Sequence, residues 1–141
     1  MRGALTRGGW LAVAVMVLTA VACNETPTAP SRQDLIGRWV VSSLQPVNAA
    51  SVTPQSGVEL VMDFTDERVS VQGDCNNCFG GYTLTGGSIA MPTLACTRRA
   101  CVGTNYEDVF FDLISSAHTA EVVPAHSLVL SGQRGRIVLR R

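Results

Sequence analysis

Two close pairs of cysteines are the residues of this sequence whose types and spacing could do chemistry. Two residues separate Cys75 from Cys78, and four residues separate Cys96 from Cys101. Four thiols in two pairs can form disulfides, hold a zinc ion or exchange disulfides with another protein. The residues around the pairs favour disulfides.

A zinc site and a redox site have weaker support. The stretch from Cys75 to Gly81 looks like a zinc knuckle, but the spacing between Cys96 and Cys101 departs from the two residues of zinc-ribbon folds. A redox Cys-x2-Cys motif normally begins a helix, because a helix N-terminus lowers the thiol pKa. Two glycines follow this motif and disfavour a helix. We predict no metal, and a thiol-redox protein using Cys75 and Cys78 is an alternative function.

Disulfides are the default for cysteines of an exported chain, and three pairings of these four are possible. We prefer Cys75–Cys96 with Cys78–Cys101, since each loop of about 20 residues could contribute on the order of 3 kcal/mol in the chain-entropy model. Pairing Cys75 with Cys78 would close a tight, strained ring and stabilise the fold little. The fifth cysteine, Cys23, is left over.

The other residues with catalytic side chains form no recognisable site. His118 and His126 lie eight positions apart with no nucleophile pattern nearby. Asp63, Asp66 and Glu67 are explained by a strand end and a solvated turn. The sequence has no phosphate-binding loop and no Gly-x-Gly-x-x-Gly after a strand. We therefore predict no catalytic residue and no cofactor.

Residues 1–22 are predicted to be a lipoprotein signal peptide. Arg2 and Arg7 precede the uncharged run Trp10–Ala22, whose 13 residues are too few for a bilayer span. Small residues then precede Cys23, as in the lipobox of bacterial lipoproteins, whose cysteine is diacylated, with palmitate for example, and becomes the mature N-terminus. We predict lipidation at Cys23. The alternative is an ordinary secretory signal that leaves a free thiol.

This signal predicts a protein of the cell envelope whose partner is the membrane, through lipidated Cys23. Residues 23–34 are rich in Pro, Thr and Ser and are predicted to be a flexible tether. Asn24 follows the cysteine, which in some Gram-negative bacteria favours the outer membrane, here facing the periplasm. An envelope protein or a hydrophobic ligand is a further possible partner.

Charge and composition exclude two classes of protein. Eleven arginines balance eleven acidic residues and the chain has no lysine, so we predict no nucleic-acid partner. A chain with 46% hydrophobic residues is too apolar for disorder. Arg134, Arg136, Arg140 and Arg141 make the C-terminus basic, which suits an edge strand protected from aggregation, or contact with anionic lipid.

The segments that must position these residues show mainly the period-two pattern of strands. Strands are expected over 35–41, with Trp39 in the core, over 58–64 and over 69–73. Two hairpins are expected, over 82–91 around the paired glycines 86 and 87, and over 128–139. A helix over 105–117 follows the capping box Thr104-x-x-Glu107. Antiparallel strands with one packed helix predict an α+β domain.

Five features in order resemble the META (HslJ-like) domain, a family that includes bacterial lipoproteins. They are the segment 73–76 (Gly-Asp-Cys-Asn), the strand start 80–82, the segment 93–97 ending in Ala-Cys-Thr, a helix with Glu107, Phe110 and Leu113, and the strand 128–130 (Leu-Val-Leu). The resemblance covers residues 35–141, and Trp39 matches the opening Trp of the family. Asp74 replaces the usual Gly, and Cys78 and Cys101 are additional.

The resemblance implies an open or cracked β-barrel with one packed α-helix. It implies a non-catalytic envelope protein linked to stress tolerance or binding. If Cys75–Cys96 is the family's shared bridge, Cys78–Cys101 is a second one. A carrier of a hydrophobic ligand is a further alternative.

Overall fold

The computed structural model describes residues 27–103, 106–123 and 126–141. The predicted signal peptide (residues 1–22) and its lipidation site Cys23 lie outside these residues, as does Thr104 of the predicted capping box. Within the described residues, no helix is long and apolar enough to cross a membrane.

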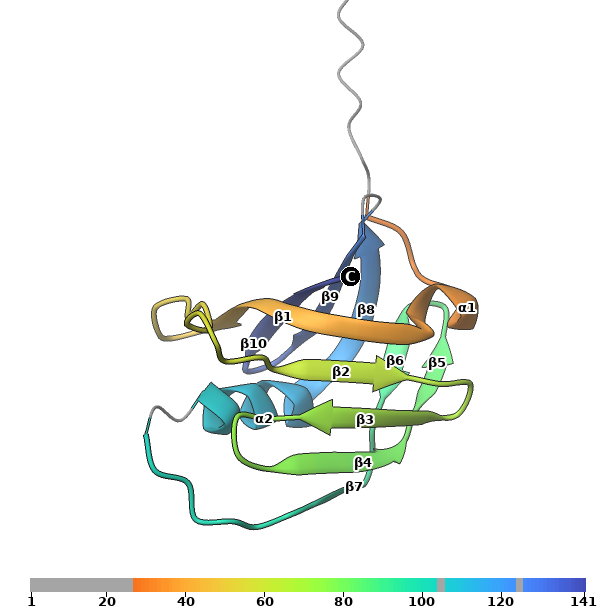
Figure 1. Cartoon of the computed structure of the whole chain (residues 1–141). Coiled ribbons are helices and arrows are strands. Elements are labelled where there is room, and N and C mark those ends of the chain that lie inside the picture. Colours follow the sequence, from red (N-terminus) through yellow and green to blue (C-terminus); the bar gives the residue numbers. More distant parts are fainter. Residues whose placement is uncertain (1–26, 104–105, 124–125) are drawn as a thin grey trace, which may run out of the picture.

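Ten antiparallel strands form one sheet, which two helices accompany (Figure 1). The order in the sheet is β5-β6-β8-β9-β10-β1-β2-β3-β4-β7. The elements, in chain order, are α1 (Arg32–Leu35), β1 (Gly37–Pro46), β2 (Val61–Phe64), β3 (Arg68–Gln72), β4 (Asn77–Gly81), β5 (Thr83–Thr85), β6 (Ser88–Ala90), β7 (Leu94–Cys96), α2 (Tyr106–Ser116), β8 (Ala117–Val123), β9 (Ser127–Gly132) and β10 (Gly135–Arg140).

One bent hairpin makes the sheet curl. Tyr82 alone separates β4 from β5, and residues 91–93 separate β6 from β7. Strands β4 and β5 therefore form one arm of a long hairpin, and β6 and β7 form the other arm. Near the hairpin's tip, Ser88 of β6 pairs with Thr119 of β8. Gly86 and Gly87 at the tip have φ angles of 54° and 83°, which glycine adopts readily. The curled sheet confirms the α+β, open barrel-like fold.

The core lies inside the curl and follows the expected alternation. On β2, Met62 and Phe64 are buried among Trp39, Val69 and Val71 of the neighbouring strands. Trp39 is 1% exposed, as expected for a core residue. The strand predicted over 58–64 is shorter than expected and begins at Val61, although Leu60 is already fully buried.

Helix α2 packs against β1, β9 and β10 through Phe110, Leu113 and Ile114. It lies within one residue of the predicted range 105–117 at each end. Its C-terminal end approaches β9 so closely that a Cβ on Gly132 would collide with the carbonyl oxygen of Ser116. A glycine at position 132 therefore lets the helix reach the sheet.

The second half of the predicted tether belongs to the folded domain, so the boundary expected at residue 34 is wrong. Thr28 pairs with Val122 of β8, and Pro30 is buried. Ser31 caps α1 together with Asp34, whose carboxylate accepts bonds from the Ser31 backbone N–H (2.8 Å) and hydroxyl (2.6 Å). Tertiary contacts, which composition does not reveal, hold this segment in place.

Candidate functional site

The four cysteines of the domain form two disulfides, but in another pairing than expected. The bonds join Cys75 to Cys101 and Cys78 to Cys96. The predicted pairs, Cys75–Cys96 and Cys78–Cys101, are therefore wrong. Cys78 on β4 and Cys96 on β7 are directly opposite in the ladder, with Cα atoms 4.0 Å apart. Cys75 lies in the turn before β4, and its partner Cys101 lies in the chain beyond β7.

This pairing of the cysteines is relevant to the two alternatives to structural disulfides, a thiol-redox site and a zinc site. Cys75 and Cys78 are bonded to different partners, whereas a redox Cys-x2-Cys centre closes and opens a bond between its own two cysteines. Three atoms, the sulfurs of Cys75 and Cys101 and one carboxylate oxygen of Glu107, all lie within 4.8 Å of one another. This spacing suits metal ligands. Both sulfurs are engaged in the disulfide, and metal binding by cysteine requires a thiolate.

A buried carboxylate, Glu107, lies beside the Cys75–Cys101 bridge and connects α2 to the turn before β4. Its Oε2 accepts hydrogen bonds from the backbone N–H groups of Cys75 (2.9 Å) and Asn76 (2.7 Å). Its Oε1 accepts a third from Nδ2 of Asn76 (2.7 Å). Gly73 lies against the same carboxylate, since a Cβ there would be 2.5 Å from Oε2. Glu107 thus bonds across the fold, whereas the capping box predicted a local role at the helix N-terminus.

Asn76 extends these contacts to the loop that follows β7. Its Oδ1 accepts hydrogen bonds from the Arg99 backbone N–H (2.7 Å) and from the Thr97 hydroxyl (3.0 Å). The side chain is 7% exposed, so both halves of its amide are used inside the protein. We call Glu107, Asn76, Gly73 and the Cys75–Cys101 bridge the polar node.

Glu107 of the polar node and its neighbour Asp74 have pKa values that move in opposite directions. Burial alone would raise the pKa of Glu107, but the hydrogen bonds from Asn76 and Cys75 outweigh it and hold the pKa below its usual value. Desolvation and the neighbouring Glu107 carboxylate raise the pKa of Asp74. Separated pKa values are common at catalytic sites, yet every described partner of Glu107 is a structural group of its own fold.

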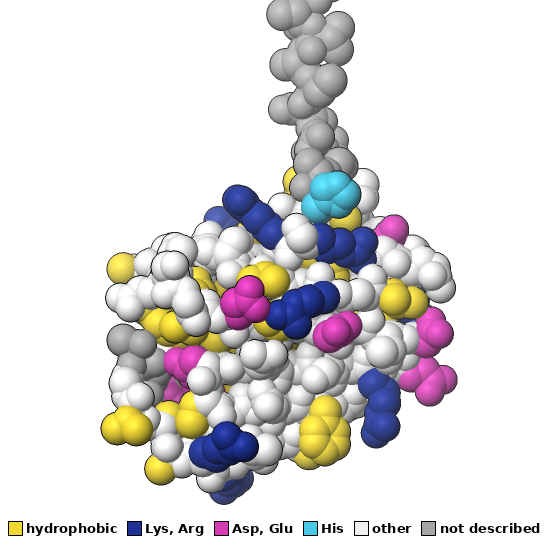
Figure 2. All heavy atoms as spheres, in the orientation of Figure 1, with side chains coloured by type: hydrophobic (Ala, Val, Ile, Leu, Met, Phe, Trp, Pro, Cys, Tyr) yellow, Lys and Arg dark blue, Asp and Glu magenta, His cyan; other side chains and the backbone are white. Residues whose placement is uncertain are grey.

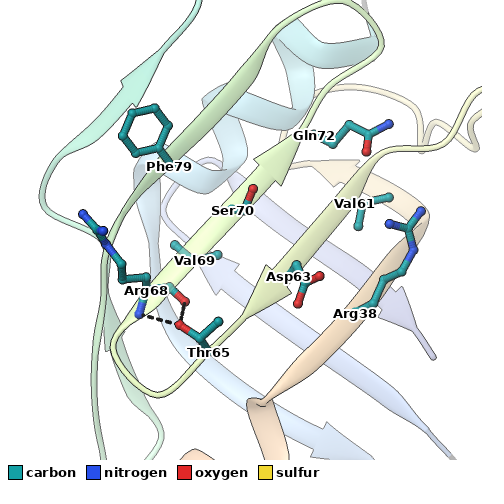
Figure 3. Close-up of a pocket in the computed structure, with 9 residues that line it drawn as sticks. All are labelled: Arg38, Val61, Asp63, Thr65, Arg68, Val69, Ser70, Gln72 and Phe79. Atoms are coloured by element: carbon teal, nitrogen blue, oxygen red, sulfur yellow. Dashed lines mark hydrogen bonds between the residues drawn. The ribbon is translucent and has the colours of Figure 1, made fainter.

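A shallow recess on the outer face of β1–β4 is the second candidate site (Figure 3). It has a volume of about 410 Å³, with Val61 and Val69 among its lining residues. Phe79 lines one side and is 58% exposed, which is unusual for an aromatic ring. Figure 3 shows Phe79 and Arg68 toward one side, with Arg38 and Val61 toward the other.

The polar side chains of this recess are available to a ligand. Arg38 is opposite Asp63 in the sheet but forms its ion pair with Glu59 (2.9 Å). Within the described residues, the side chains of Asp63, Ser70 and Gln72 make no hydrogen bond. The recess therefore offers hydrogen-bonding groups and a ring for recognition, without a paired nucleophile and base.

An apolar groove of about 270 Å³ lies between β7 and α2. Its apolar side chains come from both sides of the groove, along with the Cys78–Cys96 bridge: Met91, Pro92, Leu94, Phe111 and Ile114. The groove lies at an edge of the curled sheet, because β7 pairs with β4 alone. More apolar side chains line the groove than line the recess around Phe79.

The remaining predicted residues are far apart or in solvent. His118 is the second residue of β8 and His126 follows the end of that strand, and both are exposed. Asp66 and Glu67 lie in the exposed turn between β2 and β3, as expected.

The C-terminal arginines do not form one patch. Arg134 pairs with Asp112 of α2 and Arg136 with Gln45, whereas Arg140 and Arg141 lie at the other end of β10. Because β10 pairs with both β9 and β1, the expected edge strand is wrong.

Comparison with known proteins identifies the domain but not its ligand. No curated protein matches the chain. An NMR structure of a protein from Burkholderia xenovorans has the same fold, with a TM-score of 0.67 and 20% sequence identity over 87% of this chain and 94% of that one. The family model of the META domain matches residues 33–141. Since this match covers more than half of the sequence, this chain belongs to the META domain family.

Proposed function

We propose that this protein is an HslJ-like lipoprotein of the cell envelope, which acts by binding and not by catalysis. The two disulfides of the domain are the observation that carries the proposal. Disulfides persist in oxidising compartments and are rare in the cytosol, where thiols are kept reduced. A META domain with two of them therefore fits an exported chain, and residues 1–22 have the pattern of an export signal.

Lipidation at Cys23 accounts for the fifth cysteine. The other four are consumed by the two bridges, and an exported protein with one spare thiol is prone to wrong pairing. Acylation of Cys23 would remove that thiol and hold the domain on a membrane, with two or three acyl chains giving stable anchoring. Asn24 favours the outer membrane, facing the periplasm. A role in envelope stress tolerance follows from the family resemblance.

A binding role is supported by the contrast between the buried polar groups, which are hydrogen-bonded within the fold, and exposed polar side chains of the recess that make no hydrogen bond with the described residues. The META domain is not a known enzyme family. Glu107 and Asn76, the buried polar residues of the domain, are fully engaged with each other and with backbone groups. The side chains of Asp63, Ser70 and Gln72, which make no hydrogen bond with the described residues, lie instead in the open recess around Phe79. Such a surface can recognise a partner without supplying a nucleophile.

Intact-mass analysis of protein extracted from bacterial membranes tests the proposal. A mature chain that begins at Cys23 and carries acyl chains is expected, with a gain of roughly 4 Da on reduction, two hydrogens for each disulfide. The control Cys23→Ala should lose the acyl mass and leave the membrane fraction. A mature wild-type chain with no acyl mass would exclude the lipoprotein assignment. A larger gain on reduction would mean other bridges.

The groove between β7 and α2 favours a second candidate, a carrier of a hydrophobic ligand. Five apolar side chains line it next to an unpaired strand edge. Titration of the delipidated domain with a fluorescent fatty acid should then show saturable binding. Phe111 and Ile114 both line the groove. Phe111 is the better position to vary because it is partly exposed, whereas Ile114 is buried, with 3% of its surface exposed. If Phe111→Ser does not weaken binding, the fatty acid does not occupy the groove.

A further inference from the structure

The N-terminal segment 27–36 is fastened to the domain at its very start. Thr28 and Val122 exchange two backbone hydrogen bonds, of 3.0 and 2.9 Å. Ala29 packs close to the β5–β6 turn, and Pro30 is buried. The fixed part of the chain therefore begins at residue 28 and not near residue 35.

Two arginines hold the segment to the domain, Arg141 from the C-terminus and Arg32 from within the segment itself. The Arg141 guanidinium lies 4.2 Å from the centre of the Trp39 ring and donates to the carbonyl oxygens of Asp34 and Ile36, each at 2.7 Å. Arg32 lies 5.2 Å from the centre of the Tyr82 ring and donates to the Asp66 carbonyl oxygen. Cation–π contacts and charge-assisted bonds of this kind resist peeling of the segment from the sheet.

The segment starts beside the end of β8, which defines a face of the molecule. We call Thr28, Val122, Val123, His126 and Arg140 the exit face; the pairing of Val123 with Ser127, and of Ser127 with Arg140, places them together. Figure 1 shows the end of β8 and the C-terminus at this end of the molecule, and Figure 2 shows a histidine and arginines gathered there.

The chain between Cys23 and the exit face is short. Five residues lead from Cys23 to Thr28, and a fully extended chain spans at most about 3.5 Å per residue, or roughly 17 Å in all. A lipid anchor at Cys23 would therefore keep Thr28 within about that distance of the headgroups.

We propose that the exit face lies against the headgroup layer of the bilayer that holds Cys23, which rests on the proposed lipidation. Arg140 is exposed and makes no side-chain bond with the described residues, so its guanidinium is available to lipid phosphates. The opposite end of β10 is then farther from the membrane by the length of the strand, roughly 17 Å. Val47 lies at that end, where its backbone N–H donates a hydrogen bond to the Arg134 carbonyl oxygen. The groove between β7 and α2 is then open to the periplasm.

Tryptophan fluorescence in vesicles tests the orientation. The full-length lipidated protein is reconstituted into vesicles of phosphatidylethanolamine and phosphatidylglycerol, with or without bromine on the acyl chains near the headgroup. The variants Val123→Trp and Val47→Trp place the same new residue at the two ends of the molecule. Trp39 is common to both, so the added emission is the difference from the parent protein.

Quenching of the added emission in Val123→Trp, with none in Val47→Trp, is the expected result. Equal quenching of the two, or stronger quenching of Val47→Trp, would overturn the orientation while the protein still floats with the vesicles. Protein that does not float has no anchor, and then the lipidation proposal fails and the orientation with it. The parent's far-ultraviolet circular dichroism is the control for folding of both variants.

Discussion

Replacing Glu107 by glutamine should destabilise the domain strongly, although the shape of the side chain hardly changes. The carboxylate accepts two backbone N–H groups on one oxygen and the Asn76 amide on the other. A glutamine has one acceptor oxygen, so its NH2 group must face either the two N–H groups or Nδ2 of Asn76. At least one buried donor is then left facing another donor.

The size of the effect follows from these bonds. A hydrogen bond to a charged group contributes about 1.5–3 kcal/mol, and an unsatisfied buried donor costs about 1–3 kcal/mol. Glu107→Gln loses the charge on three bonds and one acceptor, so we expect a loss of about 3 kcal/mol in the free energy of unfolding. For a domain of this size, that lowers Tm by roughly 12–20 °C.

Urea unfolding at pH 7 with the disulfides intact, followed by circular dichroism, measures this loss. Glu67→Gln is the matched control, because Glu67 is exposed in a turn and its variant should be within about 0.5 kcal/mol of the parent. If Glu107→Gln unfolds at the same urea concentration as Glu67→Gln, the bonds at the polar node do not stabilise the fold and the reasoning fails.

The pH dependence gives a second measure of the same carboxylate. The pKa of Glu107 is lower in the folded than in the unfolded state, so its contribution is present above the unfolded value of about 4.5 and is lost as the pH falls through the folded value. The parent should therefore lose stability on acidification through this window. Glu107→Gln should show a smaller loss there, since glutamine does not titrate.

Three further predictions concern neighbouring residues. Asp74→Asn should raise stability slightly at pH 7 and not at pH 3 in urea unfolding, because the raised pKa of Asp74 means that its ionisation disfavours the fold; solvent screening keeps the gain below about 1 kcal/mol. Cys75→Ser with Cys101→Ser should cost about 3 kcal/mol in the same assay, since the bridge closes a loop across 26 positions; peptide mapping of the parent should find Cys75 linked to Cys101, and a Cys75–Cys96 peptide would contradict the fold. Gly132→Ala should lower Tm by well over 5 °C in a thermal scan, whereas Gly81→Ala, with its nearest atom 3.7 Å away, should change it much less.

The disulfide pairing agrees with the hairpin pattern that is visible in the sequence. In an antiparallel hairpin, two residues face each other when they lie at equal distances from the turn along the two strands. The hairpin expected around Gly86 and Gly87 therefore already favoured the inner pair, Cys78 with Cys96, and the outer pair, Cys75 with Cys101. Loop entropy, on which the other pairing was chosen, varies too slowly with loop length to distinguish the two.

The role of Glu107 was harder to predict, because its partners lie 31 and 32 positions away in the chain. An early glutamate in a helix matches a capping box, which explains the residue locally and needs no distant partner. The long-range signal was at Gly73, which lies in the turn between β3 and β4 but is not among the glycines with a positive φ angle, so the turn itself does not require glycine there. It has no side chain because the Glu107 carboxylate occupies that space.

The segment before β1 differs from the predicted flexible tether for another reason. Periodicity needs more than one turn of helix to be visible, and α1 has four residues. Its stability comes from Arg32 and Arg141, whose aromatic partners Tyr82 and Trp39 are distant in the chain. Proline and threonine in a segment indicate disorder only when no such contacts cover it.

The fold and the node together bear on where this protein acts. The four cysteines that first suggested chemistry, together with Glu107, hold the turn before β4, the chain beyond β7 and α2 to one another. A carboxylate whose lone pairs are occupied by its own backbone is poorly placed to take a proton from a substrate. The side chains left open, Asp63 and Phe79 among them, lie on the outside of the sheet that these bonds make rigid. Rigid support for an open surface is what recognition of a partner requires, because little order has to be gained on binding.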